Sequence, residues 1–235
     1  SGTLTLSARN EYTGATTISA GVLRATRSRA LGTPDGGVTV SDGAALELSG
    51  DLTINTEALT LNGTGINSGG ALRNISGDTI YGGLITLSTS SRINSDSGTL
   101  TLDKSTNQIT GTNINLTIGG SGNITVSGII GTGSGTLTKD GSGTLTLSGA
   151  STYTGSTTIS EGTLYITNAA GLGNASTGTT VSDGATLKVS GGLTVAEPIT
   201  INGSGVSNVG AIYFESGNNI YSGAISLEES SSITS

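Results

Sequence analysis

The chain has 235 residues, of which 40 are glycine and 2 are proline, and it contains no cysteine, histidine, methionine or tryptophan. Its net charge is −7, so it lacks the basic surface that nucleic-acid binding requires. Without histidine and cysteine, the chain cannot form a Ser-His-Asp triad, a Cys-His dyad or a His-ligated zinc site. Aromatic residues make up 3%, which predicts a thin interior of small and β-branched side chains.

Short segments of alternating apolar and polar residues follow one another along the chain. Such alternation predicts strands with one apolar face. In chain order they include residues 3–6, 38–40, 45–48, 52–54, 59–61, 84–87, 100–102, 114–118, 124–126 and 137–138. Turn-forming pairs such as Asp42-Gly43 and Asn62-Gly63 separate them. Segments 24–31 and 166–172 are long enough for a turn of helix, and we interpret them as loops that bulge from the scaffold.

A long internal repeat organises the sequence. Ser1–Ser7 returns unchanged as Ser142–Ser148, at an offset of 141 residues, and one residue is lost near Asn55. We therefore divide the chain into a first copy, residues 1–141, and a truncated second copy, residues 142–235. We expect residues 1–95 and 142–235 to superpose, with Leu6 and Leu147 on the same side of the sheet wall.

Two all-β layouts agree with strands this short. Antiparallel hairpins would form a sandwich or a barrel, whereas stacked coils would form a parallel β-helix. The long-range repeats, the varied turns and the short strands favour the β-helix, a solenoid in which each unit packs only on its neighbours. At roughly 20–25 residues per coil, the 141-residue unit holds about six coils and the chain about ten. We expect ladders of Thr, Ser and Asn along the stack, with asparagine giving side-chain hydrogen bonds along it.

Residues 135–166 read GTLTKDGSGTLTLSGASTYTGSTTISEGTLYI. This stretch closely resembles the passenger-associated β-strand repeat of autotransporter proteins. The family pattern has a Leu-Thr-Lys-x-Gly-x-Gly-Thr-Leu-Thr-Leu-Ser-Gly core, followed by Tyr-Thr-Gly, Thr-Thr-Ile and Gly-Thr-Leu. A second, less faithful match covers residues 1–25.

The resemblance implies a right-handed parallel β-helix that reaches the cell surface of a Gram-negative bacterium by type V secretion through the periplasm. It also implies a C-terminal outer-membrane β-barrel translocator, which this chain does not include. The chain opens within a repeat, so we expect a segment of a longer protein, without a signal peptide of its own. The absence of cysteine suits passage through an oxidising compartment, and no run of 18 apolar residues is present.

Tyr12 and Tyr153 are the candidate surface contacts. They occupy equivalent repeat positions, and an exposed row of tyrosines would stack on sugar rings. The competing interpretation places each tyrosine in a coil corner, with its hydroxyl bonded to the backbone. Tyr81 and Tyr221 form a second equivalent pair to which both interpretations apply.

We predict no catalytic residue, no cofactor and no metal ligand. Asp42, Asp140 and Asp183 each precede a glycine in a predicted turn, and Glu228-Glu229 point to opposite sides of a strand. The basic residues near the start of the chain are interpreted as solvated loop charges; they are Arg9, Arg24, Arg27 and Arg29. The Thr-x-Thr motifs begin at positions 3, 99, 136 and 144. Because these gaps are irregular, we do not expect the in-register threonine face that ice binding requires.

The sequence thus predicts a non-enzymatic structural or adhesive segment of an autotransporter passenger, a rigid β-helix stalk displayed at the bacterial surface. Its expected partners are molecules of host or neighbouring cells, and it would not insert directly into the membrane. The alternative is a polysaccharide-binding or polysaccharide-processing β-helix, similar to a lyase or a tailspike. That alternative requires a cluster of acidic or basic residues on one face.

Overall fold

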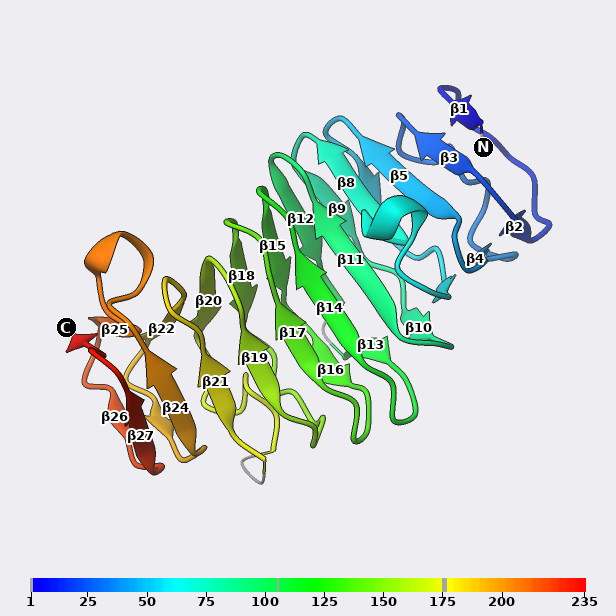
Figure 1. The fold of residues 1–235 in the computed structure, drawn as a ribbon. Helices are drawn as coiled ribbons and strands as arrows, with labels where there is room; N and C mark the ends of the chain where they lie inside the picture. Colours follow the sequence, from blue (N-terminus) through cyan, green and yellow to red (C-terminus); the bar gives the residue numbers. More distant parts are fainter. Residues whose placement is uncertain (1, 105, 175–176) are drawn as a thin grey trace.

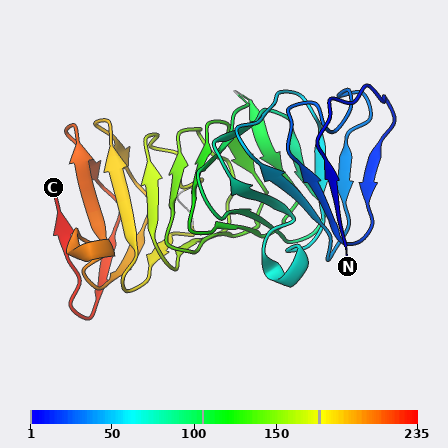
Figure 2. The same ribbon diagram turned by 90° about the horizontal axis from the view of Figure 1, so that it is seen from above.

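The computed structural model describes residues 2–104, 106–174 and 177–235, and it forms a parallel β-solenoid of about ten turns (Figure 1). Each described strand pairs in parallel with a strand about one turn away along the chain, as β1 does with β3. The two termini lie at opposite ends of a rod (Figures 1 and 2). The predicted solenoid is therefore confirmed, and the antiparallel layout is wrong for this chain.

The largest sheet has eleven strands and runs the whole length of the rod. Its strands, in order, are β1 (Thr3–Leu6), β3 (Val22–Ala25), β5 (Ala45–Ser49), β8 (Leu72–Ser76), β11 (Ser91–Ser95), β14 (Leu116–Gly119), β17 (Leu137–Lys139), β19 (Thr157–Ile159), β21 (Thr179–Val181), β24 (Ile199–Asn202) and β27 (Ile225–Glu228). Eleven strands enclose ten complete turns between the first and the last.

Three smaller sheets form the other two walls. The nine-stranded sheet comprises β6 (Thr53–Ile54), β9 (Thr79–Tyr81), β12 (Thr99–Leu102), β15 (Asn123–Val126), β18 (Thr144–Leu147), β20 (Thr163–Ile166), β22 (Thr186–Ser190), β25 (Ile212–Ser216) and β28 (Ile233–Thr234). The six-stranded sheet comprises β2 (Thr16–Ile18), β4 (Val38–Val40), β7 (Leu59–Leu61), β10 (Ile85–Leu87), β13 (Asn107–Thr110) and β16 (Ile129–Gly131). The two-stranded sheet pairs β23 (Thr194–Val195) with β26 (Ile220–Tyr221).

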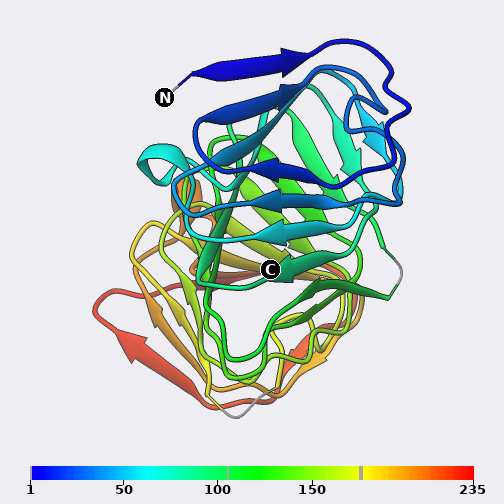
Figure 3. The same ribbon diagram turned by 90° about the vertical axis from the view of Figure 1, so that its right-hand side faces the viewer.

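The turns wind around a common interior (Figure 3). Stacked apolar side chains fill this interior. One buried column in the eleven-stranded sheet contains Leu23, Leu46, Leu72, Ile93 and Ile118. Burial of each such side chain contributes roughly 1.5–3 kcal/mol. The turns differ in length, since Thr3 pairs with Val22 but Leu46 pairs with Leu72. The core therefore stays in register although the loops do not have a constant length.

Asparagine side chains connect successive turns by hydrogen bonds, as predicted. The Oδ1 atoms of Asn113, Asn115 and Asn123 accept bonds from the backbone N–H groups of Ser134, Thr136 and Thr144, each at 3.0 Å. These bonds give a partner to backbone groups at corners, where the sheet ladder is interrupted. The predicted asparagine hydrogen bonds along the stack thus join a side chain to the backbone of the next turn here.

The loops at 24–31 and 166–172 differ from the prediction that they bulge outward. Ala30, Leu31 and Leu172 are buried, and Arg24 and Ile166 belong to strands β3 and β20. Apolar side chains on these loops close the core in two turns in which one wall has no strand. The protruding segments are instead two short 3₁₀ turns, η1 (Ile66–Ser68) and η2 (Val206–Asn208). η1, in cyan, projects at the lower edge of Figure 2, and η2 lies in the orange loop above β25 in Figure 1.

Equivalent strands of the two sequence copies lie in different sheets. β1 belongs to the eleven-stranded sheet, whereas its counterpart β18 belongs to the nine-stranded sheet. Likewise β2 belongs to the six-stranded sheet and its counterpart β19 to the eleven-stranded sheet. From β1 to β17 the chain makes six turns, and β18 lies one wall further along. The second copy is therefore displaced by one wall around the solenoid.

Equivalent side chains of the two copies still face the same side of their sheets despite this displacement. Leu147 is buried, and Leu6 is half-buried and packs against the same core. The sequence alternation sets which side chains face inward, and it has the same form on all three walls. Superposition of residues 1–95 on 142–235 as whole bodies remains a prediction.

Candidate functional site

The two candidate tyrosines differ in exposure. Tyr153 is fully buried, and its hydroxyl lies 2.8 Å from Oγ1 of Thr157. Tyr12 is 39% exposed, and its hydroxyl lies 2.9 Å from Oγ1 of Thr16. The ring of Tyr153 is therefore not accessible to a ligand, and Tyr12 alone retains a surface position.

A glycine in the next turn allows each tyrosine ring to pack. Gly32 and Gly173 have φ values of 86° and 82°, in the left-handed region that favours glycine. A Cβ atom at Gly32 would lie 2.8 Å from ring carbons of Tyr12, and one at Gly173 would lie 3.0 Å from ring carbons of Tyr153. Backbone conformation and close approach both explain why the repeat has glycine here.

Tyr81 lies beside the buried Glu57, and Tyr221 lies near the buried Glu197. The hydroxyl of Tyr81 donates to the backbone oxygen of Glu57 at 2.8 Å, as the coil-corner interpretation predicts. Oε1 of Glu197 accepts a bond of 2.8 Å from the Thr179 hydroxyl. Burial raises the pKa of Glu197 to about 7, although the Thr179 bond opposes this shift. Burial also raises the pKa of Tyr221, and the nearby Glu197 raises it further.

Lys139 is a buried lysine within the repeat motif. Its Nζ atom donates to the backbone oxygens of Asp140, Gly141 and Glu161 at 2.8, 2.6 and 3.0 Å. Burial lowers its pKa to about 8, while Asp140 and Glu161 act in the opposite direction. Three carbonyl partners indicate that the ammonium group fastens a corner between two turns.

A ladder of alternating charge crosses the outer face of the eleven-stranded sheet. The side chain of Glu47 is only 6% exposed. Its carboxylate pairs with Nη2 of Arg24 at 2.7 Å and with Nη1 of Arg73 at 3.5 Å. Arg73 also contacts Asp96 at 2.6 Å. Arg24 was predicted to be a solvated loop charge, and that prediction is wrong because Arg24 lies in β3 opposite Glu47. Arg9 is exposed and pairs with the exposed Glu11.

The second copy replaces this ladder with an aromatic one. Tyr165, Lys188 and Tyr213 are neighbours in register on the nine-stranded sheet, at positions equivalent to Arg24, Glu47 and Arg73. Nζ of Lys188 lies 4.6 Å from the ring centroid of Tyr165, and Lys188 also pairs with Glu215. Two chemically different ladders thus connect equivalent strands.

The remaining acidic residues lie in turns or on the surface. Asp42 and Asp183 precede Gly43 and Gly184, whose φ values are 74° and 75°, as predicted for turns. Asp140 precedes Gly141 and also pairs with Arg92 at 2.5 Å. Among the residues that the structure describes, no group of three potential metal ligands comes together, and no helix is long and apolar enough to cross a membrane.

Threonine side chains form in-register columns on the outer walls. In the six-stranded sheet the column contains Thr17, Thr39, Thr60, Thr86 and Thr110. In the eleven-stranded sheet it contains Thr117, Thr138, Thr158, Thr180 and Thr200. These columns confirm the predicted threonine ladders. The Thr-x-Thr motifs do not form one in-register face, as expected, because Thr3 and Thr5 pair with Val22 and Arg24 and Thr99 pairs with Asn123.

Comparison with protein families finds the passenger-associated transport repeat at residues 1–25 and 137–166. These segments contain strands β1 to β3 and β17 to β20, together with Tyr12, Tyr153 and Lys139. The resemblance that the sequence suggested is thereby confirmed for both segments. Comparisons with curated proteins and with solved structures find no match.

Proposed function

We propose that this chain is a rigid, non-enzymatic part of a bacterial autotransporter passenger, which holds other parts of the protein away from the cell. The observation that carries the proposal is the eleven-stranded sheet, which continues from β1 to β27. It includes strands of both segments that match the transport repeat, and it continues through the residues between and after them. A parallel solenoid of this kind makes contacts mainly between adjacent turns and resists bending through its continuous sheet. Contact with host or neighbouring cells would be an additional role of its outer walls.

The pairing of acidic side chains supports a structural role. An enzyme that cleaves polysaccharides needs two carboxyl groups facing one substrate. Here the carboxylates of Asp96, Asp140 and Glu215 each pair with a basic side chain. Such pairs stabilise the wall and compete with proton transfer to a substrate.

Surface display can be tested with epitopes placed in the two protruding turns. Asn67 and Ser207 are exposed, so an epitope inserted after either residue should bind antibody on intact cells that express the parent protein. A periplasmic marker protein is the control for intact outer membranes. Antibody binding that appears only after lysis would contradict display at the surface.

The spacer role can be tested by shortening the rod in whole turns. Leu4 and Lys139 occupy the same inward-facing column of the eleven-stranded sheet, so deletion of residues 4–138 removes six turns in register. At about 4.8 Å per turn, the passenger tip should lie about 30 Å closer to the membrane in cryo-electron tomograms. A tip height that does not change would contradict the stalk, even if display persists.

A further inference from the structure

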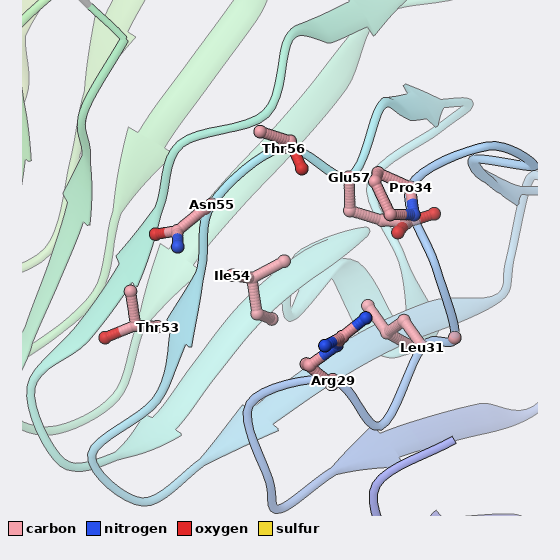
Figure 4. Close-up of a pocket in the computed structure, with 9 residues that line it drawn as sticks. Arg29, Leu31, Pro34, Thr53, Ile54, Asn55, Thr56 and Glu57 are labelled. Atoms are coloured by element: carbon pink, nitrogen blue, oxygen red, sulfur yellow. The ribbon is translucent and has the colours of Figure 1, made fainter. Parts of the chain in front are cut away.

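A small cavity opens on the wall of the first copy (Figure 4). It has a volume of about 290 Å³ and is lined by residues of the 29–34 loop and of the segment Thr53–Glu57. Arg29 and Leu31 border it from the loop, and Ile54 lies between them and Asn55 and Thr56 in this view. The cavity is near the lower limit for small-molecule sites, so it has room for about one sugar ring.

The two sequence copies share the scaffold of this region but only part of its polar lining. Leu31 and Gly32 recur as Leu172 and Gly173, and Glu57 recurs as Glu197. By contrast, Arg29 is replaced by Ala170, Thr56 by Ala196, and Asn55 falls at the one-residue deletion. Three of the groups able to bind a polar ligand, Arg29, Asn55 and Thr56, are therefore absent from the second copy.

Arg29 has a strained backbone that its counterpart lacks. Its φ is 88°, in the left-handed region that side-chain-bearing residues rarely adopt, whereas Ala170 has no positive φ. Two hydrogen bonds from Asn10, in the preceding turn, hold this loop. The backbone N–H of Asn10 donates to the backbone oxygen of Arg29 at 2.9 Å, and its side-chain amide donates to the backbone oxygen of Ala30 at 2.7 Å. Strain of this kind is concentrated at functional sites. The guanidinium group of Arg29 is exposed at the rim of the cavity.

Glu57 lacks the partner that its counterpart has. Glu197 bonds to the hydroxyl of Thr179, but the residue equivalent to Thr179 in the first copy is Val38, which has no hydroxyl. Glu57 is 4% exposed and lines the cavity. Burial raises the pKa of Glu57; a bond with the Gly37 backbone opposes this, and Asp35 adds to it. The Glu57 carboxyl thus lines the cavity without the hydroxyl partner that Glu197 has.

We propose that this cavity binds a single sugar residue that carries a carboxylate. Arg29 would pair with the ligand carboxylate, as guanidinium groups do in charge-assisted bonds. Thr53, Asn55 and Thr56 supply hydroxyl and amide groups for the sugar hydroxyls, and Glu57 supplies a further partner at the buried end. Leu31, Pro34 and Ile54 give the apolar surface on which the C–H face of a sugar ring packs.

Binding is tested with this chain by titrating N-acetylneuraminic acid and glucuronic acid, with glucose as the neutral control and acetate as the simple anion. Amide NMR shifts should concentrate at residues 29–34 and 53–57, with dissociation constants of about 1 mM or tighter for the acidic sugars. Glucose and acetate should each bind at least about tenfold more weakly. Equal binding of acetate would overturn the sugar part of the proposal, and equal binding of glucose would overturn the acidic part.

The variants use residues that the second copy already has. Arg29→Ala and Thr56→Ala should weaken binding of the acidic sugars, the first by at least about tenfold. Arg27→Asn, also the second-copy residue, removes the same charge two positions from Arg29 outside the cavity and should leave affinity unchanged. Equal losses in Arg29→Ala and Arg27→Asn, or no shifts at the cavity with either acidic sugar, would overturn the proposal. Neither result would affect the stalk function, which does not depend on this cavity.

Discussion

At the level of single residues, the buried glutamate Glu197 is the group with the clearest energetic consequence. Its exposed fraction is 4%, and burial raises its pKa to about 7. A pKa higher in the folded than in the unfolded state means that the folded state binds its proton more tightly. The resulting stability is complete below the unfolded pKa, near 4.5, and is lost as the pH rises through about 7.

Glu197→Gln should therefore remove a pH dependence of stability. The amide is neutral at every pH and still accepts the Thr179 hydroxyl, so the variant should exceed the wild type by about 2 kcal/mol at pH 8 and match it near pH 4. Urea unfolding monitored by circular dichroism at both pH values measures this difference. Glu228→Gln, at an exposed glutamate, is the control and should show no such pH-dependent gain. A loss of stability at pH 8 in Glu197→Gln would show that the charged form is favoured in the fold.

Lys139 should be important for stability because it satisfies three backbone oxygens. Lys139→Met keeps a long apolar stem but leaves the carbonyls of Asp140, Gly141 and Glu161 without this donor. We expect a loss of about 2–4 kcal/mol in the free energy of unfolding. Lys104→Met, at a half-exposed lysine, is the control and should change it by less than about 0.5 kcal/mol. Similar values for both variants would contradict the fastening role.

At the level of strands, the two ladders offer a test of how side chains specify neighbouring turns. Glu47→Lys alone places a lysine between Arg24 and Arg73 and should destabilise the chain by about 3 kcal/mol or more. Adding Arg24→Tyr and Arg73→Tyr recreates the Tyr-Lys-Tyr ladder of the second copy and should recover most of that loss. Thermal unfolding of the single and triple variants measures the recovery. A triple variant no more stable than the single one would show that the ladders are not interchangeable.

The strands and inward positions were predictable from sequence, because alternation depends only on neighbouring residues. Ladders of threonine on the outer walls were also expected, but the residues that stack in each column were not predictable. Thr158 stacks on Thr138 across one turn and under Thr180 across the next, but the intervening loops differ in length, so sequence spacing hides the register. The buried glutamates Glu57 and Glu197 were not predicted. Their recurrence at equivalent positions of the two copies was a usable signal, because exposed acidic residues are seldom kept between repeats. The cavity depends on where the 29–34 loop lies, which no sequence period describes.

At the level of the whole molecule, a destabilising substitution should affect mainly the turns next to it, because contacts form mostly between adjacent turns. Leu147→Asp buries a carboxylate in the core, which should cost at least about 4 kcal/mol. Hydrogen exchange should increase most in β15, β18 and β20, which stack directly on one another, with the distant β5 and β8 still protected. Leu227→Asp makes the same change at a leucine that is 64% exposed and should leave exchange in those strands unaltered. Uniform loss of protection after Leu147→Asp would contradict stacking as the source of stability.

The displacement of the second copy by one wall could not be predicted from the sequence repeat. A repeat length in residues does not say how many walls it covers, and Leu-Thr-Leu or Ile-Thr-Ile strands suit every wall equally. The structure shows that the offset of 141 residues carries the chain through six turns and one additional wall. Equivalent loops consequently leave the solenoid at different corners.

The central claim, a parallel solenoid whose long repeat is displaced by one wall, is tested most directly by disulfide trapping. The chain has no cysteine, so engineered pairs report without background. Thr138 and Thr158 are partners on neighbouring strands of the eleven-stranded sheet, about 4.8 Å apart, a separation that a disulfide can bridge. If the repeat covered whole turns, β19 would instead continue the six-stranded sheet, and Thr158 would stack on Gly131. We predict rapid oxidation of the Thr138→Cys/Thr158→Cys pair and none of Gly131→Cys/Thr158→Cys; the reverse result would contradict the displaced solenoid.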